Sequence, residues 1–236
     1  MKINKLLAVS LTSMLILTGC GTIDSSSSGA KNGASSSASA SEAENGEMTT
    51  ISYEEAKESF KFGEDSFVIT LYPEYAPITC ENFEKLVSSG FYDGITFHRI
   101  VDGFMAQGGD PQGTGAGGSK ETIKGEFSAN GVDNQLSHKR GIVSMARSQN
   151  PNSASSQFFI CYDDSCTFLD GNYAAFGEVT EGMNVVDDFL KVQRDYNSMG
   201  ELASPVTPVV IEDAELLEPD ENGNPRAAFR MNNFLG

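Results

Sequence analysis

Apolar residues gather in six short runs between residues 67 and 216, and each run predicts a β-strand. The runs lie at residues 67–72, 95–100, 141–146, 157–162, 174–179 and 209–216. Together they are rich in valine, isoleucine and phenylalanine, the β-branched and aromatic residues that strands favour. Pro73 directly follows the first run and marks its end, because proline cannot donate a hydrogen bond to a neighbouring strand.

Two further segments show the spacing of amphipathic helices. In the first, Pro77 suits the first helical turn and Gly90 can end the helix. Between them, Phe83, Leu86 and Val87 fall on one face. The second helix is indicated by apolar residues at positions 183, 186, 189 and 190. Many short strands with only two helices predict an antiparallel, closed β architecture, which removes exposed sheet edges.

Composition divides the chain into four segments. Lys2 and Lys5 precede an apolar run at residues 6–17 that is too short to span a bilayer, which predicts a signal peptide over residues 1–19. Residues 20–50 are mostly serine, alanine and glycine and predict a flexible tether. Residues 51–218 are long enough for one globular domain, and the polar residues 219–236 are predicted to form a C-terminal tail.

The apolar run ends in Leu17, Thr18, Gly19 and Cys20, which resembles the lipobox of bacterial lipoproteins. In that interpretation Cys20 is acylated and becomes the mature N-terminus, and two or more acyl chains give stable anchoring. The alternative is an ordinary signal peptide with a chance cysteine. The first interpretation predicts a protein that is lipid-anchored at the extracytoplasmic face of the cell membrane.

The charge of the chain bears on its partners. It has 33 acidic and 16 basic side chains, a net charge of −17. Such a surface repels nucleic acid and anionic lipid, which argues against direct binding of either by the domain. Solubility alone is also a sufficient explanation of the charge.

The remaining cysteines, Cys80, Cys161 and Cys166, have neither the even number of a disulfide framework nor the CxxC spacing of a zinc site. A bridge between Cys161 and Cys166 stays open as an alternative. His98 and His138 are the only histidines, and neither has the sequence partners of a hydrolase or a metal site. We therefore expect no metal and no cofactor.

A glycine-rich segment at residues 113–118 satisfies GxGxxG in letter only. A dinucleotide site needs a preceding strand and an acidic residue about 20 positions further on. Here GGDPQ precedes the segment, and position 138 is a histidine. The glycines are better explained as places where the backbone can approach a peptide closely.

Three longer motifs are more specific: FHRIVDGFMAQGGD at residues 97–110, GIVSMARSQNPNSASSQFFI at 141–160 and FLDGNYAAFGEV at 168–179. In order and spacing they resemble the cyclophilin family of peptidyl-prolyl isomerases, its bacterial branch in particular, over residues 67–216. The resemblance implies an all-β-dominated fold, an eight-stranded antiparallel barrel capped by two α-helices. It also implies a cofactor-free, monomeric enzyme that acts on X-Pro-containing polypeptides, with exported unfolded proteins as its expected substrates.

The resemblance also assigns site residues. The expected catalytic residues are Arg99, Gln107 and Phe104. The expected substrate-binding residues are His98, Val101, Met105, Ala146, Arg147, Ser148, Gln157, Phe159, Phe168, Leu169 and Tyr173.

Three positions depart from the best-known eukaryotic pattern of the family. Arg147 stands where that pattern has asparagine, Phe168 where it has tryptophan and Tyr173 where it has histidine. The segment between Cys161 and Leu169 is also one residue longer. The family binds substrate at the position of Arg147 mainly through the backbone, so the arginine is compatible with the same role.

The reaction implied is rotation about an X-Pro amide, in which no covalent bond is made or broken. A twisted amide leaves a pyramidal proline nitrogen that can accept a hydrogen bond, and the guanidinium of Arg99 is a permanent donor. A non-catalytic peptide-binding or chaperone module on the same barrel is the main alternative, and a structural envelope protein is a third. The presence of Arg99 and Gln107 favours the enzyme, because a binding module needs no donor aimed at the amide nitrogen.

Overall fold

The structure is a computed structural model of the chain and describes residues 48–236. The predicted signal peptide, Cys20 and most of the predicted tether lie outside these residues. Eight strands form one sheet: β1 (Ser66–Leu71), β2 (Arg99–Val101), β3 (Met105–Gly108), β4 (Ile142–Met145), β5 (Phe158–Cys161), β6 (Ala175–Glu181), β9 (Ile211–Leu217) and β10 (Arg226–Met231). Neighbouring strands are antiparallel, in the order β2-β3-β5-β4-β6-β1-β10-β9.

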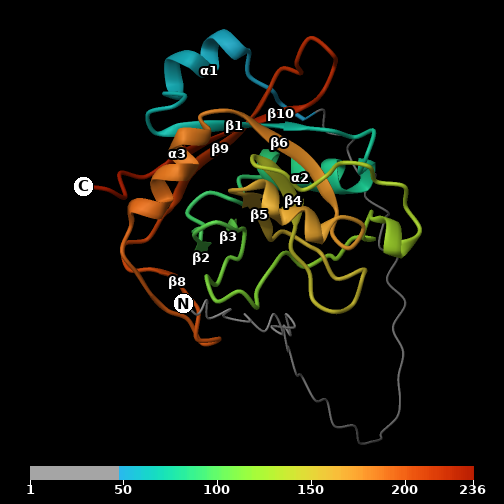
Figure 1. Cartoon of the computed structure of the whole chain (residues 1–236). Helices are drawn as coiled ribbons and strands as arrows, with labels where there is room; N and C mark the ends of the chain where they lie inside the picture. The colour runs from blue at the N-terminus through green and yellow to red at the C-terminus, as the bar shows by residue number, and fades with distance from the viewer. Residues whose placement is uncertain (1–47) are drawn as a thin grey trace, which may run out of the picture.

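The sheet curls until its two edges meet (Figure 1). The backbone N–H of Gly94 donates to the carbonyl of Ile211 at 2.7 Å, and the N–H of Ile211 donates to the carbonyl of Ile95 at 2.9 Å. The N–H of Phe97 donates to the carbonyl of Val209 at 2.9 Å. These bonds join the segment before β2 to the start of β9. The predicted eight-stranded antiparallel fold with helices is confirmed.

Aromatic side chains fill the interior of the curled sheet. Phe67, Phe158 and Phe229 come from three different strands and are fully buried. The first predicted helix, α2 (Pro77–Ser88), places Phe83 among them, with its ring 5.5 Å from that of Phe158. The other predicted helix is α3 (Met183–Asp188), which continues as the 3₁₀ turn η3 (Phe189–Lys191). Burial of rings from strands and helices in one core stabilises the closed sheet.

A further helix, α1 (Tyr53–Ser59), was not predicted. Ser52 accepts a hydrogen bond from the backbone N–H of Glu55 at 3.2 Å, and Glu55 accepts one from the N–H of Ser52 at 3.0 Å. This reciprocal arrangement is a capping box, and it fixes the start of the helix. Ala56 and Phe60 then pack in a small cluster with residues of β1, β9 and β10, and Figure 1 shows α1 beside these strands.

The prediction that residues 219–236 form a tail is wrong. Within this segment β10 lies between β1 and β9, with Phe229 opposite Phe67 on one side and Ala214 on the other. The rings of Phe229 and Phe67 are stacked 5.4 Å apart. The strand is short, carries two alanines and is flanked by polar residues, so its sequence lacks a clear apolar run. The domain therefore includes the C-terminal residues.

A hairpin of β7 (Arg194–Tyr196) and β8 (Leu202–Pro205) was also not predicted. It packs beside β2 at the lower edge of the molecule in Figure 1. Strand β3 and the 3₁₀ turns η1 (Ser128–Asn130) and η2 (Asp164–Leu169) complete the elements that the sequence patterns did not predict. Over residues 48–236, no helix combines the length and the apolar character needed to cross a bilayer.

Candidate active site

Arg99 begins a row of hydrogen-bonded polar side chains. Arg99 on β2 pairs with Gln107 on β3, and its Nη1 donates to Gln107 Oε1 at 3.3 Å. Gln107 Nε2 donates to Gln157 Oε1 at 2.8 Å. Gln157 Nε2 in turn donates to the carbonyls of Gly115 and Gly117 at 3.1 and 2.7 Å. Because the oxygen of Gln107 accepts from Arg99 and its nitrogen donates to Gln157, the row fixes the orientation of the Gln107 amide.

An apolar cavity opens beside this row. Its lining consists of Arg99, Phe104, Met105, Gln107, Ala146, Arg147, Phe159, Leu169 and Tyr173, all of which were predicted site residues. Met105, Phe159 and Leu169 are almost fully buried. The guanidinium carbon of Arg99 lies 5.7 Å from the centre of the Phe104 ring. The cavity thus places a permanent cation beside an apolar wall, an arrangement that can accommodate a proline ring.

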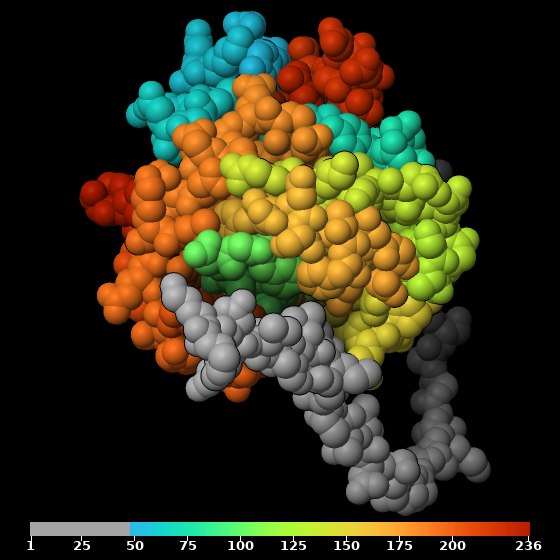
Figure 2. Space-filling model, in the orientation of Figure 1, coloured from blue at the N-terminus to red at the C-terminus, as the bar shows by residue number. Residues whose placement is uncertain are grey.

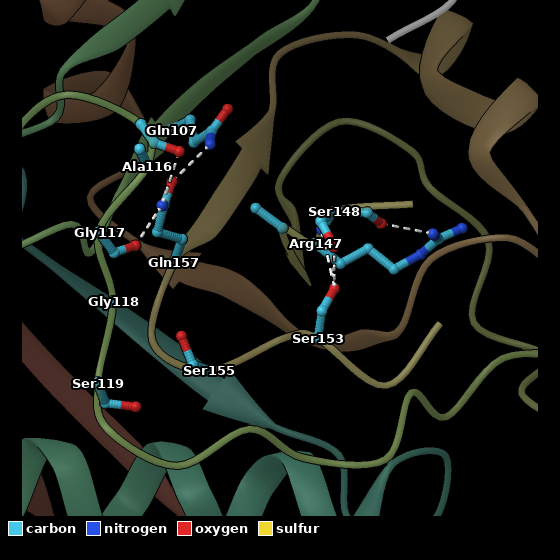
Figure 3. Close-up of a pocket in the computed structure, with 12 residues that line it drawn as sticks. Gln107, Ala116, Gly117, Gly118, Ser119, Arg147, Ser148, Ser153, Ser155 and Gln157 are labelled. Carbon is cyan, nitrogen blue, oxygen red and sulfur yellow. Dashed lines mark hydrogen bonds between the residues drawn. The ribbon is translucent and has the colours of Figure 1, made fainter. Parts of the chain in front are cut away.

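A second, more polar cavity shares Gln107, Ala146 and Arg147 with the lining of the first, and Gln157 of the polar row also lines it (Figure 3). Its lining also includes Gly115, Ala116, Gly117, Gly118, Ser119, Ser148, Ser153 and Ser155. Figure 3 shows Gln157 pointing toward Gly117 and Gln107 on one side, with Ser148 and Ser153 on the other. Because the two cavities adjoin, they form a groove that can take an extended peptide.

Asp110 holds the glycine-rich loop that lines the polar cavity. Its carboxylate accepts hydrogen bonds from the backbone N–H groups of Gln112, Thr114, Gly115 and Gly117, at 2.7–3.2 Å. Burial acts to raise the pKa of Asp110, but these donors outweigh it and the pKa is lowered. The glycine-rich GxGxxG segment is therefore a loop whose backbone N–H groups surround the carboxylate of Asp110. Sequence reasoning missed this role, although Asp110 ends the first motif.

Arg147 uses its side chain to support the wall of the cavity. Its guanidinium lies 4.7 Å from the centre of the Tyr173 ring and 4.9 Å from that of Phe127. Its Nη2 also donates to the carbonyl of Asn172 at 2.7 Å. These contacts explain how an arginine can replace a smaller residue here, because the side chain lies along Tyr173 and the backbone remains at the groove.

Three predicted site residues do not line either cavity. Val101 packs, partly buried, against the apolar cluster beneath the first cavity. Phe168 lies at the rim, 64% exposed, with its ring stacked 5.6 Å from that of Phe104. His98 packs behind the glycine-rich loop, since a β-carbon at Gly115 would lie 3.6 Å from its Nε2. Burial is the main cause of the lowered pKa of His98, which is therefore neutral at pH 7.

His138 has partners that the sequence did not reveal. Its Nδ1 lies 2.8 Å from Asp170 Oδ1, and its Nε2 lies 2.9 Å from Ser144 Oγ. The imidazole thus links a serine and an aspartate as in a hydrolytic triad. Ser144, however, is fully buried and cannot contact a substrate. The His138 ring instead stacks 6.0 Å from that of Phe159, so the trio supports the floor of the apolar cavity.

Cys161 and Cys166 lie in the same cluster, beneath Met105 and Leu169, and both are free thiols. Cys166 Sγ lies 3.1 Å from the carbonyl oxygen of Phe104. Among residues 48–236, no group of three or more histidine, cysteine, aspartate and glutamate side chains gathers as a metal site.

Glu201 is a further site residue that no sequence pattern predicted. It lies on the β7–β8 hairpin, 102 positions from Arg99, and outside all three motifs. Its carboxylate accepts from Arg99 Nε at 2.6 Å and from Nη2 at 2.9 Å. The hydrogen bond from Arg99 is the main cause of the lowered pKa of Glu201. In Figure 2 the green surface near residue 100 lies between the orange segment of this hairpin and the segment near residue 170.

Comparison with known proteins agrees with this geometry. The sequence model of the family described as cyclophilin type peptidyl-prolyl cis-trans isomerase/CLD matches residues 58–216. A peptidyl-prolyl cis-trans isomerase-like 1 of Gibberella zeae is 41% identical over 157 residues, covering 66% of this chain and 91% of that protein. Peptidyl-prolyl cis-trans isomerase B of Bacillus subtilis is 48% identical over 113 residues, covering 48% and 75% respectively.

A solved structure shows the same likeness in three dimensions. The cyclophilin type peptidyl-prolyl cis-trans isomerase of Cryptosporidium parvum, crystallised in the presence of the dipeptide Ala-Pro, has a TM-score of 0.55 and 31% sequence identity. The match covers 64% of this chain and 96% of that one. The chain thus belongs to the cyclophilin-type peptidyl-prolyl cis-trans isomerases and is an enzyme of that activity.

Proposed function

We propose that Arg99 is the catalytic donor of this isomerase, with Gln107 and Phe104 beside it. The barrier to amide rotation is about 20 kcal/mol, because the nitrogen lone pair is delocalised into the carbonyl. Twisting the bond returns the lone pair to the proline nitrogen. A guanidinium N–H placed there stabilises the twisted state more than either planar state, which is the requirement for catalysis.

The observation that carries this proposal is the position of Arg99 at the mouth of an apolar cavity. Only 12% of its side chain is exposed, and Phe104, Met105 and Phe159 form the adjoining wall. A proline ring in this cavity would displace water from the guanidinium. A hydrogen bond from a cation is stronger in such a water-poor site than in solvent.

Gln107 and the backbone around Ala146 are the groups suited to hold the rest of the peptide. The N–H of Ala146 is already bonded to the carbonyl of Gln157 at 2.9 Å, which fixes this edge of the groove. Gln107 is held by Arg99 and Gln157 together and lies on the border of both cavities. An extended chain can therefore lie across the polar cavity while its proline enters the apolar one.

We further propose that this enzyme assists the folding of exported proteins, as a monomer anchored by acylated Cys20 at the extracytoplasmic face of the membrane. The support is the sequence of the N-terminal segment, in which a lysine-flanked apolar run ends at the lipobox-like cysteine. The acidic charge of the chain is consistent with a domain held away from anionic lipid by a polar tether.

The test of the catalytic assignment is an X-Pro peptide isomerisation assay on the full chain. Arg99→Ala should lower kcat/KM by about 10²–10³-fold, the range for one preorganised donor. Arg99→Lys should recover little, because an ammonium lacks the planar fork. Arg140→Ala is the matched control, since Arg140 also pairs with a carboxylate, that of Asp187, away from the cavities. Full activity in Arg99→Ala with an unchanged circular dichroism spectrum would refute the role.

A further inference from the structure

We propose that Glu201 is a positioning residue for catalysis, which holds the guanidinium of Arg99 in the orientation that turns Nη1 toward the substrate. The two carboxylate oxygens meet Nε and Nη2, the two nitrogens along one edge of the guanidinium. A planar fork bound at two points cannot rotate out of its plane. This inference rests on the catalytic role proposed for Arg99.

The contacts of Arg99 show which nitrogen is left for the substrate. Nη1 lies 3.3 Å from Gln107 Oε1 and 3.8 Å from the sulfur of Met105, and both residues line the apolar cavity. Nη1 carries two hydrogens: Gln107 Oε1 accepts one, and the other points at the Met105 sulfur, a weak acceptor that a substrate nitrogen can replace. The clamp on Nε and Nη2 therefore leaves one Nη1 hydrogen on the cavity side of the guanidinium.

The hairpin is built to hold Glu201 in place. Asn197 Nδ2 donates to Glu201 Oε2 at 3.2 Å, while Asn197 Oδ1 accepts from the backbone N–H groups of Met199 and Glu201 at 3.0 Å each. The N–H of Asn197 donates to the carbonyl of Glu201 at 2.9 Å. Asn197 thus fixes both the turn and the carboxylate, which is a stronger restraint than a carboxylate on a free loop could supply.

Burial of the arginine distinguishes this ion pair from the pair of Arg140 and Asp187. The side chains of Arg99 and Glu201 are 12% and 30% exposed, whereas those of Arg140 and Asp187 are 47% and 39% exposed. Exposed pairs contribute little because solvent screens them. The partly buried pair restrains the guanidinium of Arg99 at the apolar cavity, where its orientation affects catalysis. Removal of the Glu201 carboxylate should therefore lower the rate of isomerisation.

The carboxylate also has an opposing effect, because it partly neutralises the charge that polarises the substrate. If orientation dominates, removing the carboxylate lowers kcat. If neutralisation dominates, the same change raises kcat. We expect orientation to dominate, since the guanidinium remains a cation in either case while an unclamped arginine side chain samples many rotamers.

The experiment compares Glu201→Gln with Asp187→Asn in the full chain, by steady-state isomerisation of an X-Pro peptide. Glu201→Gln should lower kcat by about 10-fold with KM within about 2-fold, the pattern of an interaction felt mainly in the transition state. Glu201→Asp keeps the charge but shortens the reach, and should recover part of the loss. Asp187→Asn removes a carboxylate from the matched bidentate pair and should leave both constants unchanged.

A spectroscopic measurement separates positioning from a general loss of stability. In the wild type, the ¹⁵N signal of Arg99 Nε–H should be shifted downfield and protected from solvent exchange by Glu201. The shift and the protection should disappear in Glu201→Gln and persist in Asp187→Asn. An unchanged or higher kcat in Glu201→Gln, or an unchanged Arg99 signal, would overturn the proposal.

A double variant separates this proposal from the one on which it rests. If Glu201 acts through Arg99, Glu201→Gln should add no further loss in the background of Arg99→Ala. An additional loss there would show that Glu201 acts by another route. If Arg99→Ala retains full kcat, the catalytic role proposed for Arg99 is wrong. If Arg99→Ala loses kcat while Glu201→Gln retains it, only the positioning role of Glu201 is wrong.

Discussion

Phe168 stands at the rim of the apolar cavity, stacked on Phe104 and largely exposed. In family members that are sensitive to cyclosporin, the resemblance implies a tryptophan here, whose indole N–H donates to the drug. Phenylalanine has no such donor, and its smaller ring buries less surface. The loss of one neutral hydrogen bond costs about 0.5–1.5 kcal/mol, before the smaller contact is counted.

We therefore expect weak inhibition by cyclosporin-type ligands. Phe168→Trp should tighten the inhibition constant by roughly 10- to 100-fold while turnover stays nearly unchanged, because Phe168 lies outside the cavity that receives the proline. Inhibition titrations on both proteins measure the change. An inhibition constant that does not move would mean that the longer segment before Leu169 keeps this side chain away from the drug.

His98 should make the stability of the domain depend on pH. Burial lowers its pKa in the folded state below the ordinary value of about 6.5, so the unfolded chain binds the proton more readily. The contribution of neutral His98 to stability is complete above pH about 6.5, the pKa of the unfolded chain. It is lost as the pH falls from that value toward the lower pKa of the folded state. The slope from one such group is at most about 1.4 kcal/mol per pH unit.

Urea unfolding between pH 7.5 and 5.5 tests this effect. His98→Gln should show a shallower fall in the free energy of unfolding than the wild type. His138 also has a lowered pKa and is present in both proteins, so the difference isolates His98. Equal slopes would show that His98 is protonated alike in the folded and unfolded states.

At the residue scale, the sequence revealed those site residues that lie within continuous motifs. Arg99 and Gln107 are eight positions apart and face each other because a tight turn joins their strands, so one motif carries both. Glu201 meets Arg99 only through the placement of a hairpin 102 positions away. No local sequence pattern predicts this contact, because the residues around Glu201 do not distinguish it from any other surface glutamate.

At the element scale, β10 is an inner strand that joins β1 to β9. It contacts β1 and β9 along its whole length and buries Phe229 in the aromatic core. A chain truncated after Glu218 would lose this strand and leave two unpaired edges in the interior of the sheet. We expect it to be unfolded and inactive, as judged by circular dichroism and the peptide assay.

A shorter truncation is the control for this experiment. A chain ending at Phe234 keeps β10 and the contact between the rings of Phe234 and Phe189, which are 5.3 Å apart. It should fold and retain activity. Native-like activity in the chain that ends at Glu218 would mean that β1 and β9 can pair without β10.

The elements divide by the kind of signal each carries. Strands with continuous apolar runs, such as β1 and β5, are buried on both faces and are therefore visible in the sequence. The start of α1 was marked by Ser52 and Glu55, a capping signal that a search for apolar spacing overlooks. The β7–β8 hairpin has few buried residues, so its formation depends on neighbours rather than on its own pattern.

At the scale of the whole molecule, the point where the described chain enters the domain lies apart from the active site. Ile51, where the described chain enters the domain, bridges to Leu217 at the end of β9, and α1 follows it over the outside of the sheet. Figure 1 shows α1 and the β2–β3 region on opposite sides of β1 and β10. The described chain therefore enters the domain on the side away from the substrate groove.

Membrane fractionation tests the proposed lipid anchor on Cys20. Cys20→Ala should move the protein from the membrane fraction to the soluble fraction, because the acylated residue is lost. Ser25→Ala, in the same segment, leaves Cys20 in place and should stay with the membrane. The same distribution for Cys20→Ala and the wild type would exclude lipidation as the means of attachment.

The position of β10 also sets the time at which the enzyme becomes active during its own synthesis. β2 carries Arg99 and is tied to β9 through the residues just before it, and β9 is held in the sheet by β10. The most C-terminal strand of the described residues is therefore an inner strand of the sheet. A growing chain cannot close the sheet until about residue 231 has emerged, so the isomerase is expected to stay inactive until β10 has been made and has paired with β1 and β9.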